Sequence, residues 1–145
     1  MERTAAIIKP LAYQKGYSGK IITDIEAAGF SIPMMYRTQF SKEEVAYFYK
    51  MHKERPFFGE LVDYMASGPV VVLVLEKENA IKDFRNLLGP TDAKQAPPET
   101  LRGQYGTSVE KNGIHGSDSA ENATREISFF TRRQQGCGNR CQCRK

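Results

Sequence analysis

One of the two histidines lies in a segment whose residue types favour chemistry, Asn112-Gly113-Ile114-His115-Gly116-Ser117-Asp118-Ser119. Imidazole can act as a nucleophile near pH 7, and glycines on both sides leave the ring of His115 approachable. The hydroxyl and carboxylate groups that follow can bind the ring or cap the next helix. A turn histidine among capping residues is the structural alternative, and spacing alone leaves both interpretations open.

Three basic residues lie where a phosphate group could draw them. Lys9 ends an apolar strand, Arg85 lies beside the apolar stripe of a helix, and Arg102 precedes a glycine. A guanidinium binds phosphate oxygens in pairs, and a lysine adds a point charge. The chain has neither a G-x4-G-K-[ST] loop nor G-x-G-x-x-G, so side chains must hold any bound phosphate. Each cation taken alone is equally consistent with solvated surface charge.

An aromatic segment, Arg55-Pro56-Phe57-Phe58-Gly59, interrupts a helical pattern. One of its rings could stack on a nucleobase, and a plug for the apolar core is the alternative. The chain contains no serine nucleophile elbow and no H-E-x-x-H helix. The pair Glu43-Glu44 is explained by helix capping, so the pattern does not indicate paired-carboxylate catalysis.

The positive charge belongs to the end of the chain. The 145 residues carry a formal net charge of +4, which by itself suggests a nucleic-acid partner. Residues 131–145 hold Arg132, Arg133, Arg140, Arg144 and Lys145 and no acid, which leaves 16 basic against 17 acidic residues elsewhere. Because the remaining residues have a net charge of −1, a nucleic-acid-binding domain is not favoured.

All three cysteines lie in the same terminal segment, at Cys137, Cys141 and Cys143. The C-x3-C-x-C spacing without a nearby histidine is a weak zinc signal, so we expect no metal-ligating residues and a flexible basic tail over 131–145. The longest apolar run, Val70 to Leu75, is far too short to span a bilayer. With no secretory signal pattern and no cysteine elsewhere, we expect a cytoplasmic protein that binds no membrane.

The elements that must position these residues alternate between strand and helix. We expect strands over 3–9, 30–40 and 70–75, the last buried on both faces, and Pro33 suggests an irregular or edge position. We expect helices over 18–28, 79–88 and 119–129. Ser41 to Glu44 fits a capping box, and Val45, Phe48, Tyr49 and His52 follow at helical spacing. The class is therefore α/β or α+β, with one domain over 1–130.

These segments together resemble the nucleoside diphosphate kinase family. The octet around His115 matches the family signature N-x-x-H-G-S-D-S. Further blocks match in register, namely Glu2-Arg3-Thr4, Ile8-Lys9-Pro10, Glu54 to Phe58, Met65 to Val71, Arg85 to Gly89, Thr91, Thr100 to Gly103 and Arg125-Glu126-Ile127. The resemblance covers about residues 2–130.

The resemblance implies a fold and a reaction. The fold is a ferredoxin-like sandwich, a four-stranded antiparallel sheet covered by helices. The reaction is ping-pong transfer of the γ-phosphate of ATP, or of another nucleoside triphosphate, to nucleoside diphosphates through a phosphohistidine. Such chemistry depends on positioning and charge neutralisation. The resemblance also implies Mg²⁺ carried on the nucleotide phosphates and a homo-oligomer, a tetramer or a hexamer.

The resemblance further implies a role for each site residue. His115 would be the nucleophile, Glu126 would hydrogen-bond its other ring nitrogen, and Ser117 would support that carboxylate. Lys9, Tyr49 and Asn112 would contact the transferred phosphate or the sugar. Arg85, Thr91 and Arg102 would hold the outer phosphates. Phe57 would stack on the base with Leu61 behind it, and Asp118 would at most reach the metal through water.

Three features depart from the family pattern: Leu11 where an aspartate is usual, Asp92-Ala93 where Asn-Pro is usual, and the tail from Thr131. The competing hypothesis is a non-catalytic module that binds nucleotide or nucleic acid through the same cleft or the basic tail. Zinc binding by the tail cysteines is a third and weaker idea.

Overall fold

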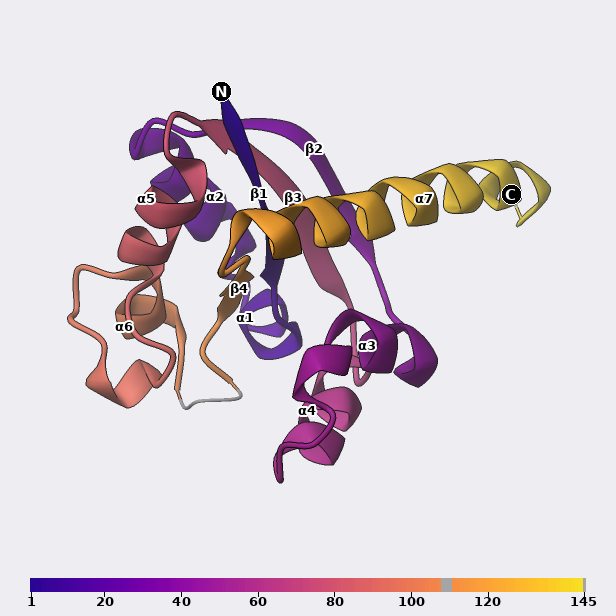
Figure 1. Cartoon of the computed structure of the whole chain (residues 1–145), viewed down its shortest axis with the longest axis horizontal. Helices are drawn as coiled ribbons and strands as arrows, with labels where there is room; N and C mark the ends of the chain where they lie inside the picture. Colours follow the sequence, from indigo (N-terminus) through magenta and orange to yellow (C-terminus); the bar gives the residue numbers. More distant parts are fainter. Residues whose placement is uncertain (108–110, 145) are drawn as a thin grey trace.

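Four antiparallel strands form the single sheet of the chain's described residues, in the order β2-β3-β1-β4 (Figure 1). The computed structural model describes residues 1–107 and 111–144, and of residues 135–144 only the backbone. The strands are β1 (Glu2–Ile8), β2 (Ser31–Thr38), β3 (Val70–Lys77) and β4 (Ile114–Gly116). The predicted ferredoxin-like sandwich with a four-stranded antiparallel sheet is confirmed.

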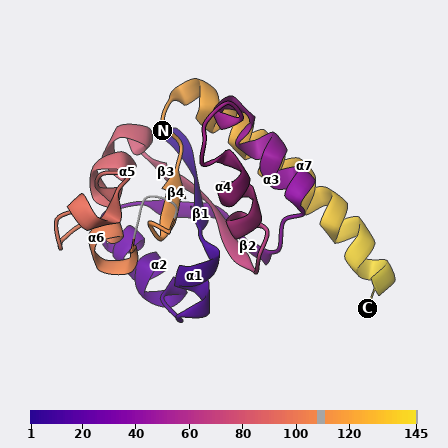
Figure 2. The ribbon, with the colours of Figure 1, turned by 90° about the horizontal axis from the view of Figure 1, so that it is seen from below.

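Helices cover both faces of this sheet, with α1, α2, α5 and α6 on one side and α3, α4 and α7 on the other (Figure 2). Their bounds are α1 (Pro10–Gln14), α2 (Ser18–Ala27), α3 (Lys42–Phe48), α4 (Phe58–Met65), α5 (Ala80–Leu88), α6 (Leu101–Tyr105) and α7 (Ala120–Arg144). Two 3₁₀ turns, η1 (Lys50–His52) and η2 (Ala93–Gln95), lie in the connections.

The central strand β3 explains why its six leading residues are all apolar. Successive side chains of a strand point to opposite faces, and both faces of β3 are covered. Leu73 and Leu75 pack with Ile25 and Phe84 on one face. On the other face, Val72 belongs to a core that includes three helix residues, Phe48, Met65 and Phe130. The predicted central position of this strand is confirmed.

The outer strand β2 carries the predicted irregularity. Its side chains alternate between exposed and half-buried, and its pairing with β3 shifts register between Ser31 and Met34. Pro33 lies in that shift, because proline cannot donate a ladder hydrogen bond and is tolerated where pairing is interrupted. The edge position inferred from this proline is correct.

The capping box at the start of α3 is also present. The Glu44 backbone N–H donates to Ser41 Oγ at 3.1 Å, and the Ser41 N–H donates to Glu44 Oε1 at 2.9 Å. The helix ends at Phe48, however, so Tyr49 and His52 belong to the connection to α4 rather than to a continuous helical stripe. The interruption near Pro56 makes a helix–turn–helix that forms one wall of the site described below.

Helix α7 is longer than predicted. It begins at Ala120, one residue after the predicted start at 119, and continues past residue 129 to Arg144. Within its described side chains, Arg133 holds the helix against α3, with its Nε 2.8 Å from Glu44 Oε2 and its Nη2 3.0 Å from the Gln39 carbonyl. The three cysteines lie among residues whose side chains are outside the described part of the chain. The flexibility predicted for residues 131–145 therefore stays a prediction.

Two departures from the family pattern are accommodated locally. The Leu11 backbone N–H donates to Tyr64 Oη at 3.0 Å, which fixes the chain just after Lys9. Asp92 Oδ1 accepts a hydrogen bond from the Lys94 backbone N–H at 3.0 Å and so caps η2. Within residues 1–107 and 111–144, none of the helices combines the length and the apolar composition that a membrane span requires.

Candidate active site

A cavity of about 250 Å³ collects side chains that are far apart in the sequence. Every predicted site residue except Ser117 lines it, namely Lys9, Tyr49, Phe57, Leu61, Arg85, Thr91, Arg102, Asn112, His115 and Glu126. These residues come from the end of β1, the α3–α4 connection, α4, α5, α6, β4, α7 and the intervening loops. The structure therefore brings together the whole predicted set, with Ser117 directly behind it.

The position of His115 follows from the pairing of β4 with the central strand β1. His115 is opposite Ile7, and the Lys9 N–H donates to the Gly113 carbonyl at 2.8 Å, which continues the pairing past the strand. A β-carbon added to Gly116 would lie 2.6 Å from Leu88 Cδ1. This glycine thus lets α5 pack tightly on β4, in addition to leaving the neighbouring ring approachable.

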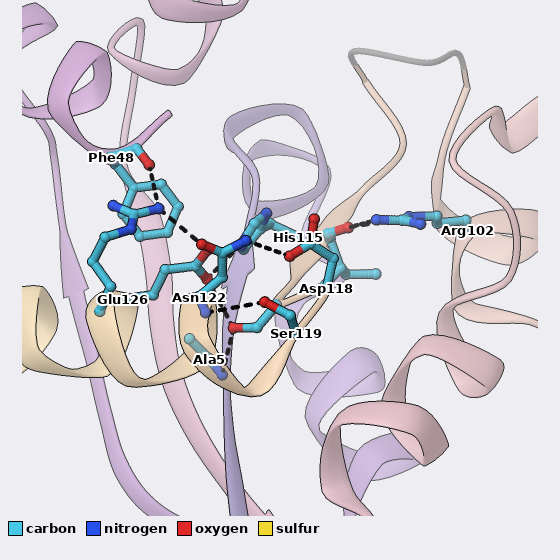
Figure 3. Close-up of polar contacts among 11 residues, drawn as sticks. Ala5, Phe48, Arg102, His115, Asp118, Ser119, Asn122 and Glu126 are labelled. Atoms are coloured by element: carbon cyan, nitrogen blue, oxygen red, sulfur yellow. Dashed lines mark hydrogen bonds and ion pairs between the residues drawn. The ribbon is translucent and has the colours of Figure 1, made fainter. Parts of the chain in front are cut away.

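A chain of hydrogen bonds fixes the imidazole (Figure 3). His115 Nε2 lies 2.8 Å from Glu126 Oε1, and Ser117 Oγ lies 2.8 Å from the same oxygen. Ser117 Oγ also accepts the backbone N–H of Ala5 at 3.2 Å, so its single hydrogen is directed at Glu126. An ionised carboxylate has no hydrogen and can only accept, so the ring nitrogen that faces Glu126 must donate. The ring hydrogen is therefore on Nε2. The other nitrogen, Nδ1, keeps its lone pair.

Aromatic rings restrict how the imidazole can turn. Phe48 and Tyr49 meet it edge-on, with ring centres 5.2 Å and 5.5 Å from the centre of the His115 ring. The histidine side chain is only 15% exposed. Because contacts with two aromatic rings and a hydrogen bond at Nε2 hold the imidazole, it is prepared for reaction before any ligand binds.

Arg102 is nearly buried, and backbone carbonyls hold it. Its Nη2 donates to the Ile114 carbonyl at 3.1 Å and its Nη1 to the Gly89 carbonyl at 3.1 Å. Burial, followed by the nearby charge of Arg85, lowers the pKa of Arg102 to about 10, so it remains a cation at neutral pH. Carbonyls that hold a guanidinium rigidly at a cavity wall suit it to bind an anion.

Several polar groups at the cavity have no protein partner among the described residues. These atoms are Tyr49 Oη, His52 Nδ1 and Asn112 Oδ1, all buried. Burial, with a further contribution from Glu126, raises the pKa of Tyr49, so its phenol stays protonated and can donate. Asn112 is oriented by its Nδ2, which donates to the Thr91 carbonyl at 2.9 Å. A polar ligand could satisfy these groups.

His52 and Arg125 line the cavity although sequence reasoning gave neither a role there. Burial and then the charge of Arg55 lower the pKa of His52, which favours the neutral ring. One signal was available: His52 stands just before the Arg55 to Gly59 segment and is one of two histidines. The apolar spacing suggested that His52 belongs to the buried face of a helix. In the structure the helix ends at Phe48, and the turn η1 places the His52 ring at the cavity instead.

The described residues contain no cluster of three or more histidine, cysteine or acidic side chains that could hold a metal ion. The cavity-lining acids are Glu126, which already accepts two hydrogen bonds, and Asp118. Asn122 Nδ2 donates to Asp118 Oδ1, and this bond is the main reason that the pKa of Asp118 is lowered. A cation here would therefore have to bring most of its ligands with it.

Comparison with known proteins identifies the chain. A family model described as nucleoside diphosphate kinase matches residues 2–135. The chain belongs to the nucleoside diphosphate kinase family. A nucleoside diphosphate kinase of Nitratiruptor is 56% identical over 130 residues, which are 90% of this chain and 95% of that protein. One from Campylobacter hominis is 50% identical over 137 residues, which are 94% of this chain and 100% of the relative.

Solved structures of the same family agree in fold. A nucleoside diphosphate kinase of Aquifex aeolicus superposes with a TM-score of 0.88 at 48% identity, over 89% of this chain and 94% of the other. One from Halobacterium salinarum, solved in complex with CDP, has a TM-score of 0.85 at 38% identity, over 89% and 86% of the two chains. The chain is accordingly an enzyme of this family, and the comparisons lend no support to a non-catalytic binding module.

Proposed function

We propose that His115 is the residue through which this enzyme passes a phosphoryl group. Its Nδ1 attacks the γ-phosphorus of a nucleoside triphosphate, and the bond from that phosphorus to the bridging oxygen breaks. The electron pair leaves with the nucleoside diphosphate, and the Nε2 proton stays in its bond to Glu126. A second nucleoside diphosphate then takes the phosphoryl group. The hydrogen-bonded series His115–Glu126–Ser117 is the observation that carries this proposal.

The cations of the cavity are proposed to hold the phosphates. Arg102, fixed by carbonyls, and Arg85 on α5 would bind the outer phosphate oxygens with Thr91 between them. Lys9, which is 5% exposed at the end of β1, would neutralise the transferred phosphate. Positioning and charge neutralisation of this kind supply most of the rate enhancement in phosphoryl transfer.

The other wall is proposed to hold the nucleoside. Phe57 would stack on the base with Leu61 behind it, and stacking tolerates any base. Tyr49 would donate to the transferred phosphate, and Asn112 Oδ1 would accept a hydrogen bond from a sugar hydroxyl. These bonds would satisfy two of the buried polar atoms that have no partner among the described residues. His52 Nδ1 lies at the same wall, and the CDP complex of the Halobacterium relative indicates that family members bind a nucleoside diphosphate.

Mg²⁺ is proposed to enter on the nucleotide, because the described residues contain no group of ligands able to hold it alone. Bound to phosphate oxygens, it would neutralise charge that develops during transfer. Asp118 fits a contact through water, since it lines the cavity and its carboxylate is oriented by Asn122.

We also propose that the enzyme is a homo-oligomer, a tetramer or a hexamer, that works in the cytoplasm. The outer strand β2 supports assembly, because its free edge could pair with another chain and its Met35 is 49% exposed. Residues 1–130 would form the catalytic domain, and 131–145 would be an appended basic segment. Sedimentation with and without residues 136–145 measures the assembly state and tests whether the segment affects it.

Transfer of label from γ-labelled ATP tests the central proposal. The protein should acquire an acid-labile, alkali-stable label that is lost in His115→Ala and is discharged by any nucleoside diphosphate. An unlabelled wild-type protein, or a label that persists in His115→Ala, would contradict it. Asp92→Asn, which alters a loop residue outside the cavity lining, is the matched control and should label normally.

A further inference from the structure

Arg125 lines the cavity, and the proposed reaction leaves it without a task. It precedes Glu126 on α7, and its Nη2 donates to the Phe48 carbonyl at 3.1 Å. The same Nη2 lies 3.8 Å from Glu126 Oε2. The guanidinium carbon is 5.9 Å from the centre of the Phe48 ring, which in turn packs edge-on against His115.

The side chain of Arg125 is 20% exposed, and neighbouring protein groups hold it in place. Its Nε and Nη1 are buried and have no hydrogen-bond partner within the described residues. Among the side chains that the structure describes, Glu126 is the one acidic group in ion-pair range of the guanidinium. Its positive charge is therefore directed at that carboxylate.

The two oxygens of Glu126 have different tasks. Oε1 accepts hydrogen bonds from both His115 and Ser117, whereas Oε2 faces Arg125. The side chains of Glu126 and Arg125 are only 5% and 20% exposed, so solvent and salt screen the interaction between their two charges weakly. A fixed cation beside the carboxylate reduces the negative potential that the imidazole experiences.

This potential matters once the phosphoryl group is on Nδ1. Because Nε2 keeps its proton, the phosphorylated ring carries positive charge, and Glu126 stabilises it. An excessively stable phosphoenzyme would be a trap, since the second half-reaction reverses the chemistry of the first. Interactions help catalysis only when they favour the transition state over the states on either side.

We propose that Arg125 is a positioning residue that weakens the hold of Glu126 on the phosphorylated His115 and so keeps the phosphoryl group easy to transfer. The proposal rests on the roles proposed above for His115 and Glu126. It assigns Arg125 to the energy of the intermediate and not to nucleotide binding, so its replacement should change the phosphorylation equilibrium while KM stays nearly constant.

The test compares a neutral with a charged replacement. Arg125→Gln removes the charge but keeps a donor for the Phe48 carbonyl, whereas Arg125→Lys keeps the charge. Each purified protein is equilibrated with labelled ATP and ADP at fixed ratios, and the phosphoenzyme fraction is measured. Loss of one partly buried charge should shift the equilibrium about three- to tenfold toward phosphoenzyme in Arg125→Gln. Arg125→Lys should stay within about twofold of wild type.

The control is Arg133→Met, which removes another contact of α7 with α3 but no charge near Glu126. It should leave the equilibrium unchanged. An unchanged equilibrium in Arg125→Gln, or an equal shift in Arg125→Lys, would overturn the inference. Arg125→Met replaces the glutamine variant if that protein fails to fold. A wild type that forms no phosphohistidine would refute the proposed function itself. A normal phosphoenzyme level in every variant would refute only the role of Arg125.

Discussion

On one side of the active-site cavity, β4 and α7 place His115, Glu126 and Ser117 in an unbroken series of hydrogen bonds that ends at the backbone of β1. On the other side, the α3–α4 connection and the segment before β4 leave Tyr49 Oη, His52 Nδ1 and Asn112 Oδ1 buried without a partner in the part of the protein that the structure describes. The first side is complete in the free protein, and the second is complete only with a ligand.

The difference teaches how the fold divides orientation from binding. Each buried polar group without a partner costs about 1–3 kcal/mol of folding free energy, which a nucleotide that supplies the missing bond can return. The nucleophile needs no such help, because its tautomer and rotamer are set within the protein. Mutations on the orienting side should therefore reduce kcat, and mutations on the binding side should mainly change KM and stability.

The largest expected effect is that of Glu126→Ala, which breaks the orienting side at its centre. The Nε2 hydrogen of His115 would lose its acceptor, and the ring would be free to change tautomer. We expect kcat to fall about 100- to 1,000-fold, with KM changed less than about threefold. Steady-state kinetics with a saturating acceptor measure both. A KM that rises as much as kcat falls would show that orientation and binding are not separate.

Ser117→Ala tests the outer end of the same series. It would leave the buried Ala5 N–H without the hydroxyl that accepts it, at a cost of about 1–3 kcal/mol in the free energy of unfolding. Glu126 would also lose one hydrogen bond and position His115 less firmly. Denaturant titration measures the stability, with Ser119→Ala as the matched helix-cap control. Equal stability of Ser117→Ala and wild type would contradict the assignment.

Tyr49→Phe sharpens the comparison from the binding side. The change removes a buried hydroxyl that has no partner among the described side chains, so the free protein should become about 1 kcal/mol more stable. The stabilisation that bound nucleotide provides should shrink at the same time. Thermal melting with and without a nucleoside diphosphate measures both quantities. A loss of stability in the free protein would mean that the hydroxyl already has a partner.

The smallest effect concerns Glu44, which links α3 to α7 away from the cavity. Burial acts to raise the pKa of Glu44, but hydrogen bonds from Arg133 and Ser41 outweigh it and leave the pKa below the ordinary 4.5. The pair therefore stabilises the fold fully above about pH 5, and the contribution is lost as pH falls through the folded-state pKa.

The corresponding variant is Glu44→Gln, which should cost about 0.5–1 kcal/mol at pH 7 and less at pH 3, where protonation weakens the pair in the wild type. Unfolding free energies at the two pH values check this, with Glu43→Gln as the neighbouring control. A cost independent of pH would show that the Glu44 charge contributes nothing. Because Glu44 belongs to neither side of the cavity, kcat and KM should both stay unchanged.

The sequence indicated most of the fold because its local patterns agree with its tertiary structure. The unbroken apolar run at Val70–Leu75 predicted a central strand, Pro33 predicted the irregular edge, and Ser41 with Glu44 predicted a helix start; all three are present. The end of α3 was missed, since the helical spacing of apolar side chains continues to His52 although the helix stops at Phe48.

The sequence by itself determined which chemistry was available: one histidine in a glycine-rich octet, cations suited to phosphate, and motifs that match one family. It could not decide what these groups touch, because a hydrogen-bond partner depends on the approach of segments more than a hundred residues apart, as with Ala5 and Ser117. The family resemblance implied a hydrogen bond between Glu126 and His115. The tertiary structure adds that Nε2 is the nitrogen that faces Glu126 and that Arg125 faces the same carboxylate. Short-range forces fix the elements, whereas burial and packing decide which buried groups are paired and which await a ligand.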